Sequence, residues 1–190
     1  MRIGEEVQAV PRQAGVTILL VRHGESEANV ARRINDNPNR QVNLTDLGRQ
    51  QAESVDAGQI DLAYASEFPR AQQTARLILR QAHLPVLIDP RINERRSGMD
   101  DIPVHEFNER MRRDPVHFRP EGGESFHEEM DRVGDFLDEM AIRHPGKRIL
   151  AVSHENPILA ALAVAGMDPL EAALGSIANC QAIELTWRKA

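Results

Sequence analysis

The sequence predicts an α/β protein with a three-layer fold, in which helices cover both faces of a mostly parallel central sheet. Short apolar runs alternate with helical segments along the chain, which is typical of βαβ units. Two of these runs, residues 16–21 and 149–152, are the most convincing buried strands because they are apolar throughout and end abruptly at polar residues. With 190 residues the chain has the length of one domain with a substantial core.

Local signals predict the individual elements. Five strands are expected where apolar residues are bounded by polar or turn-forming ones, at residues 16–21, 61–65, 86–88, 149–152 and 182–187. N-caps, acidic first turns and apolar residues three or four apart predict six helices, at residues 25–33, 46–57, 69–81, 104–113, 124–143 and 157–165. Thr45 is a suitable N-cap, for example, and Pro69 suits the start of a helix.

We expect one domain over residues 16–190, preceded by a polar tail of residues 1–15. Around residues 95–123 the pattern is irregular and strongly charged, and we expect a lid-like insertion there. A solvated helix with intrahelical pairs such as Glu109 and Arg113 is an equal alternative for this segment.

Composition limits the classes of function. The formal charge is −6, so no overall basic surface is available for nucleic-acid phosphates and we expect no nucleic-acid partner. The first fifteen residues lack the apolar core of a signal peptide, and no run approaches membrane-spanning length, so we expect no membrane partner. The single cysteine, Cys180, excludes an intramolecular disulfide and suits a reducing compartment. These observations predict a cytoplasmic protein.

Two predicted strands end in a histidine. Arg22 and His23 follow the first strand, and Ser153 and His154 follow the strand at 149–152. Because carboxyl ends of parallel strands face one crevice, both histidines should lie in the same site. A lone buried histidine is more often a core residue than a catalyst, but two at equivalent strand ends beside an arginine favour a functional site.

Arg70 repeats this arrangement after the strand at 61–65, where a helix is predicted to begin. A cation is unfavourable at the positive end of a helix dipole. An anion bound between Arg22, Arg70 and helix N-termini would explain the placement.

These residues belong to a set of motifs in a fixed order that resembles the histidine phosphatase superfamily, the branch that contains cofactor-dependent phosphoglycerate mutases and small phosphatases. Six pieces spread over residues 16–187 carry the resemblance. They are residues 22–29 (Arg-His-Gly-Glu-Ser-Glu-Ala-Asn), Leu44-Thr45 with Gly48 and Gln51-Ala52, Ser66 with Arg70-Ala71 and Thr74-Ala75, residues 93–95 with Gly98, residues 122–125 (Gly-Gly-Glu-Ser) and residues 152–154 (Val-Ser-His).

The resemblance implies roles for these residues. His23 would be the nucleophile, phosphorylated on a ring nitrogen, and neutral imidazole is suited to this. His154 would join Arg22 and Arg70 in holding the three equatorial oxygens of the transferring phosphoryl group, where preorganised cations stabilise the developing charge. Asn29 matches a position that often contacts substrate or phosphate.

Glu94 matches the family's proton donor to the leaving oxygen, a role that requires a raised pKa. An ion pair with Arg95 or Arg96 is the alternative. Glu124 and Ser125 either cap the long helix or, as the resemblance implies, shape the rim of the pocket.

The chain departs from the family pattern at two places. The second histidine is usually followed by two glycines, but here Glu155 and Asn156 follow His154. We expect these two residues to contact the phosphate or substrate, to narrow the pocket and to alter substrate preference, since a carboxylate beside a phosphate weakens binding unless it points away or pairs with a cation. The match is also partial at residues 98–101, where relatives often have an aromatic and an acidic residue followed by glycine.

The resulting hypothesis is a phosphomonoesterase that acts on a small phosphorylated metabolite without a metal or other cofactor. A phosphoglycerate mutase-type transfer and a catalytically weak phosphate-binding domain are the alternatives. No His/Cys cluster has metal-ligand spacing, and no phosphate loop or dinucleotide fingerprint is present. The sequence leaves the oligomeric state open, with a homodimer as one option.

Overall fold

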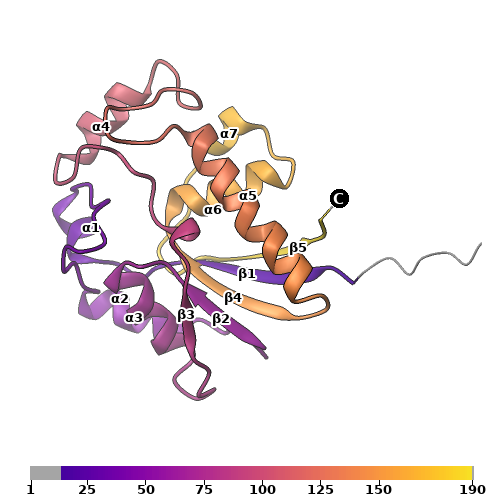
Figure 1. Ribbon diagram of the computed structural model, residues 1–190. Helices are drawn as coiled ribbons and strands as arrows, with labels where there is room; N and C mark the ends of the chain where they lie inside the picture. Colours follow the sequence, from indigo (N-terminus) through magenta and orange to yellow (C-terminus); the bar gives the residue numbers. More distant parts are fainter. Residues whose placement is uncertain (1–13, 190) are drawn as a thin grey trace, which may run out of the picture.

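The computed structural model describes residues 14–189 and has the predicted α/β architecture, with helices on both faces of a central sheet (Figure 1). Five strands form one sheet in the order β3-β2-β4-β1-β5, and every neighbouring pair is parallel except β1 with β5. The predicted tail lies almost entirely outside the described residues. Within them, no helix is both long and apolar enough to cross a membrane.

The bounds of the elements are close to those predicted. The strands are β1 (Val16–Arg22), β2 (Leu62–Ala65), β3 (Val86–Ile88), β4 (Arg148–Ser153) and β5 (Ala182–Trp187). The helices are α1 (Glu27–Ala31), α2 (Asp46–Ser54), α3 (Pro69–Ile78), α4 (Val104–Met111), α5 (Phe126–Arg143), α6 (Glu155–Val164) and α7 (Pro169–Ala173), with a 3₁₀ turn at Pro90–Ile92.

Alternate residues of β1 and β4 face two separate hydrophobic clusters, which is why the sheet needs helices on both sides. Ile18 and Ile149 pack on one face with the apolar residues of α5 and α6. Leu19 and Leu150 pack on the other face, against Ala71 and neighbouring residues of α3. Both strands are therefore covered on both faces, and their carboxyl ends meet at one edge: Arg22 is the register partner of Ser153.

Capping side chains explain why α1 and α5 begin two residues after their predicted starts. The first helix begins at Glu27 rather than residue 25, because the Ser26 hydroxyl caps it. Ser125 caps α5 in the same way, so that helix begins at Phe126 and Glu124 lies outside it. The helix predicted at 157–165 begins earlier, at Glu155, with His154 as its N-cap residue. Helix α7 was not predicted, since five residues are too few to show a helical period.

The turn after β1 is fixed by close backbone packing against α2. A Cβ atom on Gly24 would lie 2.3 Å from the Gly48 carbonyl oxygen, so only glycine fits at this position. The Thr45 amide also donates a hydrogen bond to the Glu25 carbonyl at 3.0 Å. These contacts hold the backbone that carries His23.

Candidate active site

His23 lies directly after β1 and is 2% exposed. Its Nδ1 is 2.7 Å from the Gly24 carbonyl, and its Nε2 accepts a hydrogen bond from Nε of Arg70 at 3.0 Å. The first contact places the proton on Nδ1 and the second leaves the lone pair on Nε2. Burial, and then the charge of Arg70, hold the pKa of His23 well below its usual value. The imidazole is therefore neutral at neutral pH, with its lone pair on Nε2.

Arg70 lies in the first turn of α3, where it is almost fully buried. Its Nη2 donates to the Asn35 carbonyl at 3.1 Å, its Nη1 donates to the Asn35 side-chain oxygen, and its guanidinium lies 4.4 Å from the centre of the Phe68 ring. Burial lowers its pKa to about 10, which still leaves the side chain charged at neutral pH. The guanidinium is therefore held rigidly beside His23.

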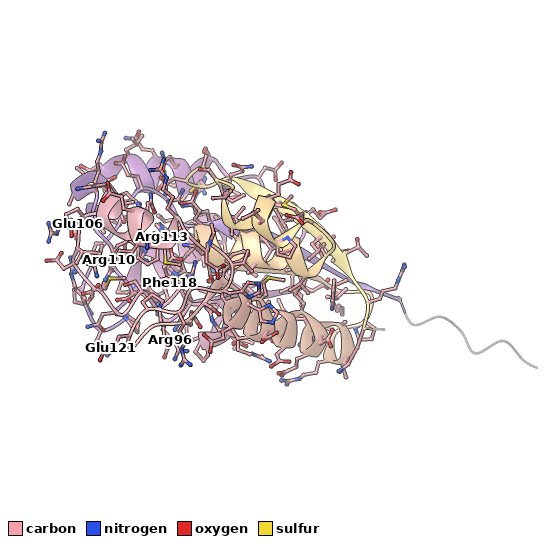
Figure 2. All side chains as sticks on the ribbon, turned by 90° about the horizontal axis from the view of Figure 1, so that it is seen from above. Arg96, Glu106, Arg110, Arg113, Phe118 and Glu121 are labelled. Carbon is pink, nitrogen blue, oxygen red and sulfur yellow. The ribbon has the colours of Figure 1, made fainter. Side chains whose placement is uncertain are left out.

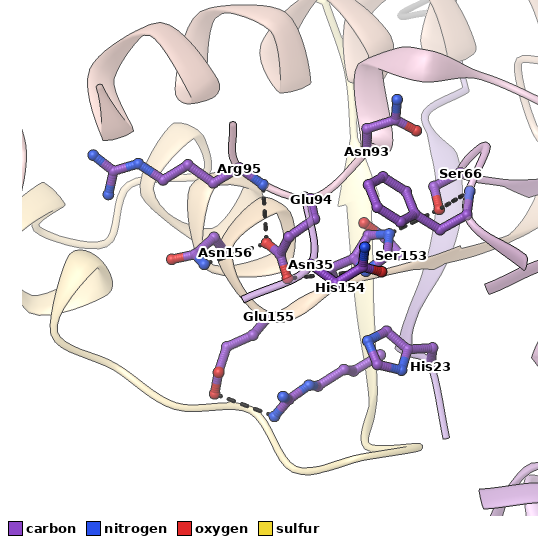
Figure 3. A network of polar contacts seen from close by, with 12 residues as sticks. His23, Asn35, Ser66, Asn93, Glu94, Arg95, Ser153, His154, Glu155 and Asn156 are labelled. Atoms are coloured by element: carbon purple, nitrogen blue, oxygen red, sulfur yellow. Dashed lines mark hydrogen bonds and ion pairs between the residues drawn. The ribbon is translucent and has the colours of Figure 1, made fainter. Parts of the chain in front are cut away.

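His154 completes this cluster from the end of β4. The His23 and His154 ring centres are 5.0 Å apart, and Nη2 of Arg70 lies 3.1 Å from Nδ1 of His154. Nε2 of His154 contacts the Ser66 hydroxyl at 2.8 Å (Figure 3). Burial, followed by the charge of Arg70, lowers its pKa far below the usual value, so this ring is also neutral. The side chain of His154 does not cap α6, so the first amide groups of that helix have no side-chain cap.

Arg22 is held from the other side by Glu155. Nη1 of Arg22 lies 3.3 Å from Oε1 of Glu155 and also donates to the Ile177 carbonyl. The same Glu155 oxygen accepts hydrogen bonds at 2.9 Å from the Ser176 hydroxyl and from the Ile177 amide. The carboxylate that the sequence places beside the phosphate site is thus paired with a cation.

Glu94 faces this cluster from the segment after the 3₁₀ turn, with 19% of its side chain exposed. Its Oε1 accepts hydrogen bonds from the Arg95 amide at 3.0 Å and from the Asn156 side chain at 3.3 Å. Its Oε2 lies 3.9 Å from Nδ1 of His154. Burial raises the pKa of Glu94 despite the opposing charge of Arg70, as a proton donor requires.

The predicted ion pair of Glu94 with Arg95 or Arg96 is absent from the described residues, and the capping alternative is confirmed for Ser125. The Arg95 guanidinium donates to the carbonyls of Glu124 and Phe118, and Arg96 pairs with Glu124, so neither forms an ion pair with Glu94. Glu124 and Ser125 do not line the pocket either: Ser125 caps α5, and Glu124 is buried among arginines.

These side chains surround a cavity of about 820 Å³. Every predicted site residue lines it except His154, which is fully buried against Arg70. Helix α4 forms another part of the wall through Val104, Phe107 and Met111. Across residues 14–189, no group of three or more His, Cys, Asp or Glu side chains is arranged to hold a metal ion.

A family model for the histidine phosphatase superfamily, branch 1, matches residues 18–190. The chain belongs to this superfamily.

Several proteins of known structure or name are similar to this chain. A metal-independent phosphoserine phosphatase of Arabidopsis thaliana is 30% identical over 152 residues, which are 72% of this chain and 63% of the plant protein. The chain therefore spans less than two thirds of that relative. An adenosylcobalamin/α-ribazole phosphatase of Escherichia coli (strain K12) is 32% identical over 150 residues, 72% of both chains. The crystal structure of the α-ribazole phosphatase from Shigella flexneri superposes with a TM-score of 0.75 at 29% identity, covering 88% of this chain and 89% of that one.

Two residues that hold the candidate site of this superfamily member had no role in the sequence interpretation. Asn35 fixes the Arg70 guanidinium, and Asn179 donates to the His23 carbonyl at 2.9 Å. Asn35 is one of several asparagines in a polar loop, and nothing local distinguishes it from the others. Asn29 lines the cavity as expected, but its side-chain oxygen accepts hydrogen bonds from Ser26 in the cap of α1.

Proposed function

We propose that this histidine phosphatase hydrolyses small phosphomonoesters through a phosphohistidine at His23. The observation that carries the proposal is the state of Nε2: a neutral imidazole nitrogen with its lone pair directed at Arg70, in a cavity that also holds Arg22 and a protonatable Glu94. Together these groups supply a nucleophile, two cations and an acid without a metal.

The reaction follows from these positions. When the phosphate binds, the Arg70 N–H group turns from Nε2 of His23 to a phosphate oxygen, which frees the lone pair. Nε2 then attacks phosphorus, the bond from phosphorus to the ester oxygen breaks, and Glu94 gives its proton to that oxygen. Arg22 and Arg70 hold the equatorial oxygens, and His154, which is buried and accepts a hydrogen bond from Arg70 through Nδ1, positions that guanidinium. A water molecule then attacks phosphorus, the phosphorus–nitrogen bond breaks, and the Glu94 carboxylate takes the water proton. The imidazole is restored and inorganic phosphate leaves.

The organic part of the substrate would occupy the outer cavity. Its wall includes α4, so we propose that the insertion at 95–123 acts as the lid expected from the sequence. Arg110 and Arg113 of this segment are exposed and, in Figure 2, lie with Glu106 among the side chains around α4. The buried Phe107 and Met111 face inward instead, where they line the cavity. The named relatives act on phosphoserine and α-ribazole phosphate, which agrees with a small phosphorylated metabolite.

The proposal is tested with p-nitrophenyl phosphate and the variant His23→Ala. We expect wild-type protein to release phosphate and to trap an acid-labile, alkali-stable phosphoenzyme on rapid quenching, and His23→Ala to lose at least ~10³-fold in kcat with no phosphoenzyme. His127→Ala is the matched control, because this histidine is exposed and does not line the cavity. Equal turnover by wild type and His23→Ala would exclude the proposal.

The same protein incubated with a phosphoglycerate separates the remaining alternatives. A phosphatase releases inorganic phosphate, a mutase forms the isomer, and a phosphate-binding domain does neither. We favour the phosphatase because the two named relatives are phosphatases. The cytoplasmic location stays a prediction from the composition and the apolar runs of the sequence.

A further inference from the structure

We propose that Asn156 is a positioning residue that decides which oxygen of Glu94 carries the catalytic proton, and thereby adapts the enzyme to esters of ordinary alcohols. The inference rests on the proposed function. Asn156 does not contact the reacting atoms in this scheme; it acts through Glu94. This assignment replaces its predicted role as a direct phosphate contact.

The two oxygens of Glu94 have different surroundings. Oε1 accepts two hydrogen bonds, from the Arg95 amide at 3.0 Å and from Nδ2 of Asn156 at 3.3 Å. Figure 3 shows the Glu94 carboxyl group between these two donors. Among the described residues, no hydrogen-bond donor is assigned to Oε2, which lies 3.9 Å from Nδ1 of His154 on the side of the phosphate site.

This difference determines where a proton is held. A carboxyl oxygen that already accepts two N–H donors is a poor place for a proton, since the proton would face those donors. The neutral acid therefore carries its hydrogen on Oε2, and that oxygen faces the cluster of His23 and His154. If Asn156 is removed, Oε1 keeps only the Arg95 amide, and the carboxyl group can rotate or carry its proton on either oxygen.

The consequence depends on the leaving group. When His23 attacks phosphorus, the electron pair of the breaking P–O bond moves to the ester oxygen, which takes the proton from Oε2. An alkoxide from an ordinary alcohol is a strong base and needs this proton, whereas a dinitrophenolate leaves without one. Positioning of the proton therefore matters for alkyl phosphates and not for dinitrophenyl phosphate.

The test compares kcat/KM of Asn156→Ala on glycerol phosphate and on 2,4-dinitrophenyl phosphate. This constant reports the first phosphoryl transfer, in which Glu94 acts as the acid. We expect a loss of at least ~10-fold on glycerol phosphate and a change within ~2-fold on the dinitrophenyl ester. Asn156→Leu, which keeps the approximate side-chain volume but donates no hydrogen bond, should behave like Asn156→Ala.

Asn39→Ala is the matched control, because this asparagine is exposed and lies outside the cavity lining; it should leave both constants unchanged. An equal loss on the two esters would mean that Asn156 only supports the fold, and no loss on either would mean that it does not position Glu94. Both results overturn the inference. Failure of the proposed function looks different: wild-type protein would then hydrolyse neither ester, or would do so as well after His23→Ala.

Discussion

The two sides of the candidate active-site cavity are built in different ways. The side that carries His23, Arg22 and His154 is an edge of the sheet, where the hydrogen-bonded register of β1 with β4 places these side chains. The side that carries Glu94 lies on an irregular segment between β3 and α4, outside the sheet. One side depends on backbone pairing, and the other must be held by side chains.

On the Glu94 side, a buried network of charged side chains holds the irregular segment in place. Arg132 of α5 donates to Glu124 at 2.8 Å, to Glu129 at 3.0 Å and to the Arg91 carbonyl at 2.6 Å. The Arg96 amide donates to Glu124 at 3.0 Å. These hydrogen bonds hold the backbone at residues 91 and 96, on either side of Glu94.

The network is built from charges that have left water, so its members depend on one another. Burial would raise the pKa of Glu124, but the hydrogen bonds and charge of Arg132 hold it below the usual value. For Glu129 burial prevails over the charge of Arg132, and its pKa is raised to about 8. The comparison therefore predicts that charge changes and pH alter the stability of the Glu94 side more strongly than that of the sheet edge.

The largest effect is expected from Arg132→Ala. It removes the main cation from the buried Glu124 carboxylate and a hydrogen-bond donor from Glu129, and breaking a buried pair in this way costs about 3–5 kcal/mol of unfolding free energy. Urea unfolding followed by circular dichroism measures the change. Arg143→Ala is the control, because Arg143 forms an exposed pair with Glu139 and should have little effect. A similarly small effect of Arg132→Ala would show that the network does not hold this side of the cavity.

Glu129→Gln should act on the pH dependence of stability. Glu129 has no exposed surface, one of its carboxyl oxygens has no hydrogen-bond partner among the described residues, and Arg132, Glu124, Glu94 and Arg95 are the charged groups around it. Between its usual pKa of 4.5 and the folded value of about 8, the unfolded chain releases this proton and the folded protein keeps it. The free energy of unfolding of the wild type therefore falls with rising pH in this window, by about 1.4 kcal/mol per unit for this group.

Glutamine does not titrate, so Glu129→Gln should be as stable as the wild type near pH 4.5 and more stable by a few kcal/mol near pH 8. Urea unfolding at half-unit steps of pH measures the two curves, and Glu53→Gln, at an exposed position of α2, is the control. If the curves of Glu129→Gln and wild type run parallel, the buried carboxyl group does not take up a proton on folding.

The difference between the sheet edge and the irregular segment also explains which features could be predicted from the sequence. Apolar runs located all five strands to within about a residue, because the pattern of a buried strand is local. His23 and His154 could be found from their positions at strand ends. Glu94 required the family resemblance, since its segment has no regular pattern. Asn35 and Asn179 could not be found at all, because each acts on a residue distant in the chain and carries no local signal.

Glu129 shows a further limit. The apolar spacing of α5 predicts which face is buried, yet Glu129 is fully buried on that helix beside Arg132. Its partner Arg132 lies three residues further along the same helix, but Arg132 is itself bound to Glu124 and to the Arg91 carbonyl, and no spacing within the helix predicts those two contacts. Buried charge is decided by the tertiary neighbours that neutralise it, which a local pattern does not contain.

The smallest effect is expected at Glu155, on the sheet-edge side. Its carboxylate pairs with Arg22 while 28% of its side chain is exposed, so the pair is worth at most about 1 kcal/mol. Glu155→Gln keeps a side-chain oxygen for the Ile177 amide and removes the charge that competes with phosphate for Arg22. KM for a phosphate ester and the inhibition constant of inorganic phosphate should both fall by ~2–5-fold, and less at high salt. Glu184 lies on β5 and forms an exposed pair with Arg148, so Glu184→Gln is the control and should change neither KM nor the inhibition constant. Unchanged or raised constants for Glu155→Gln would show that this carboxylate does not compete with phosphate for Arg22.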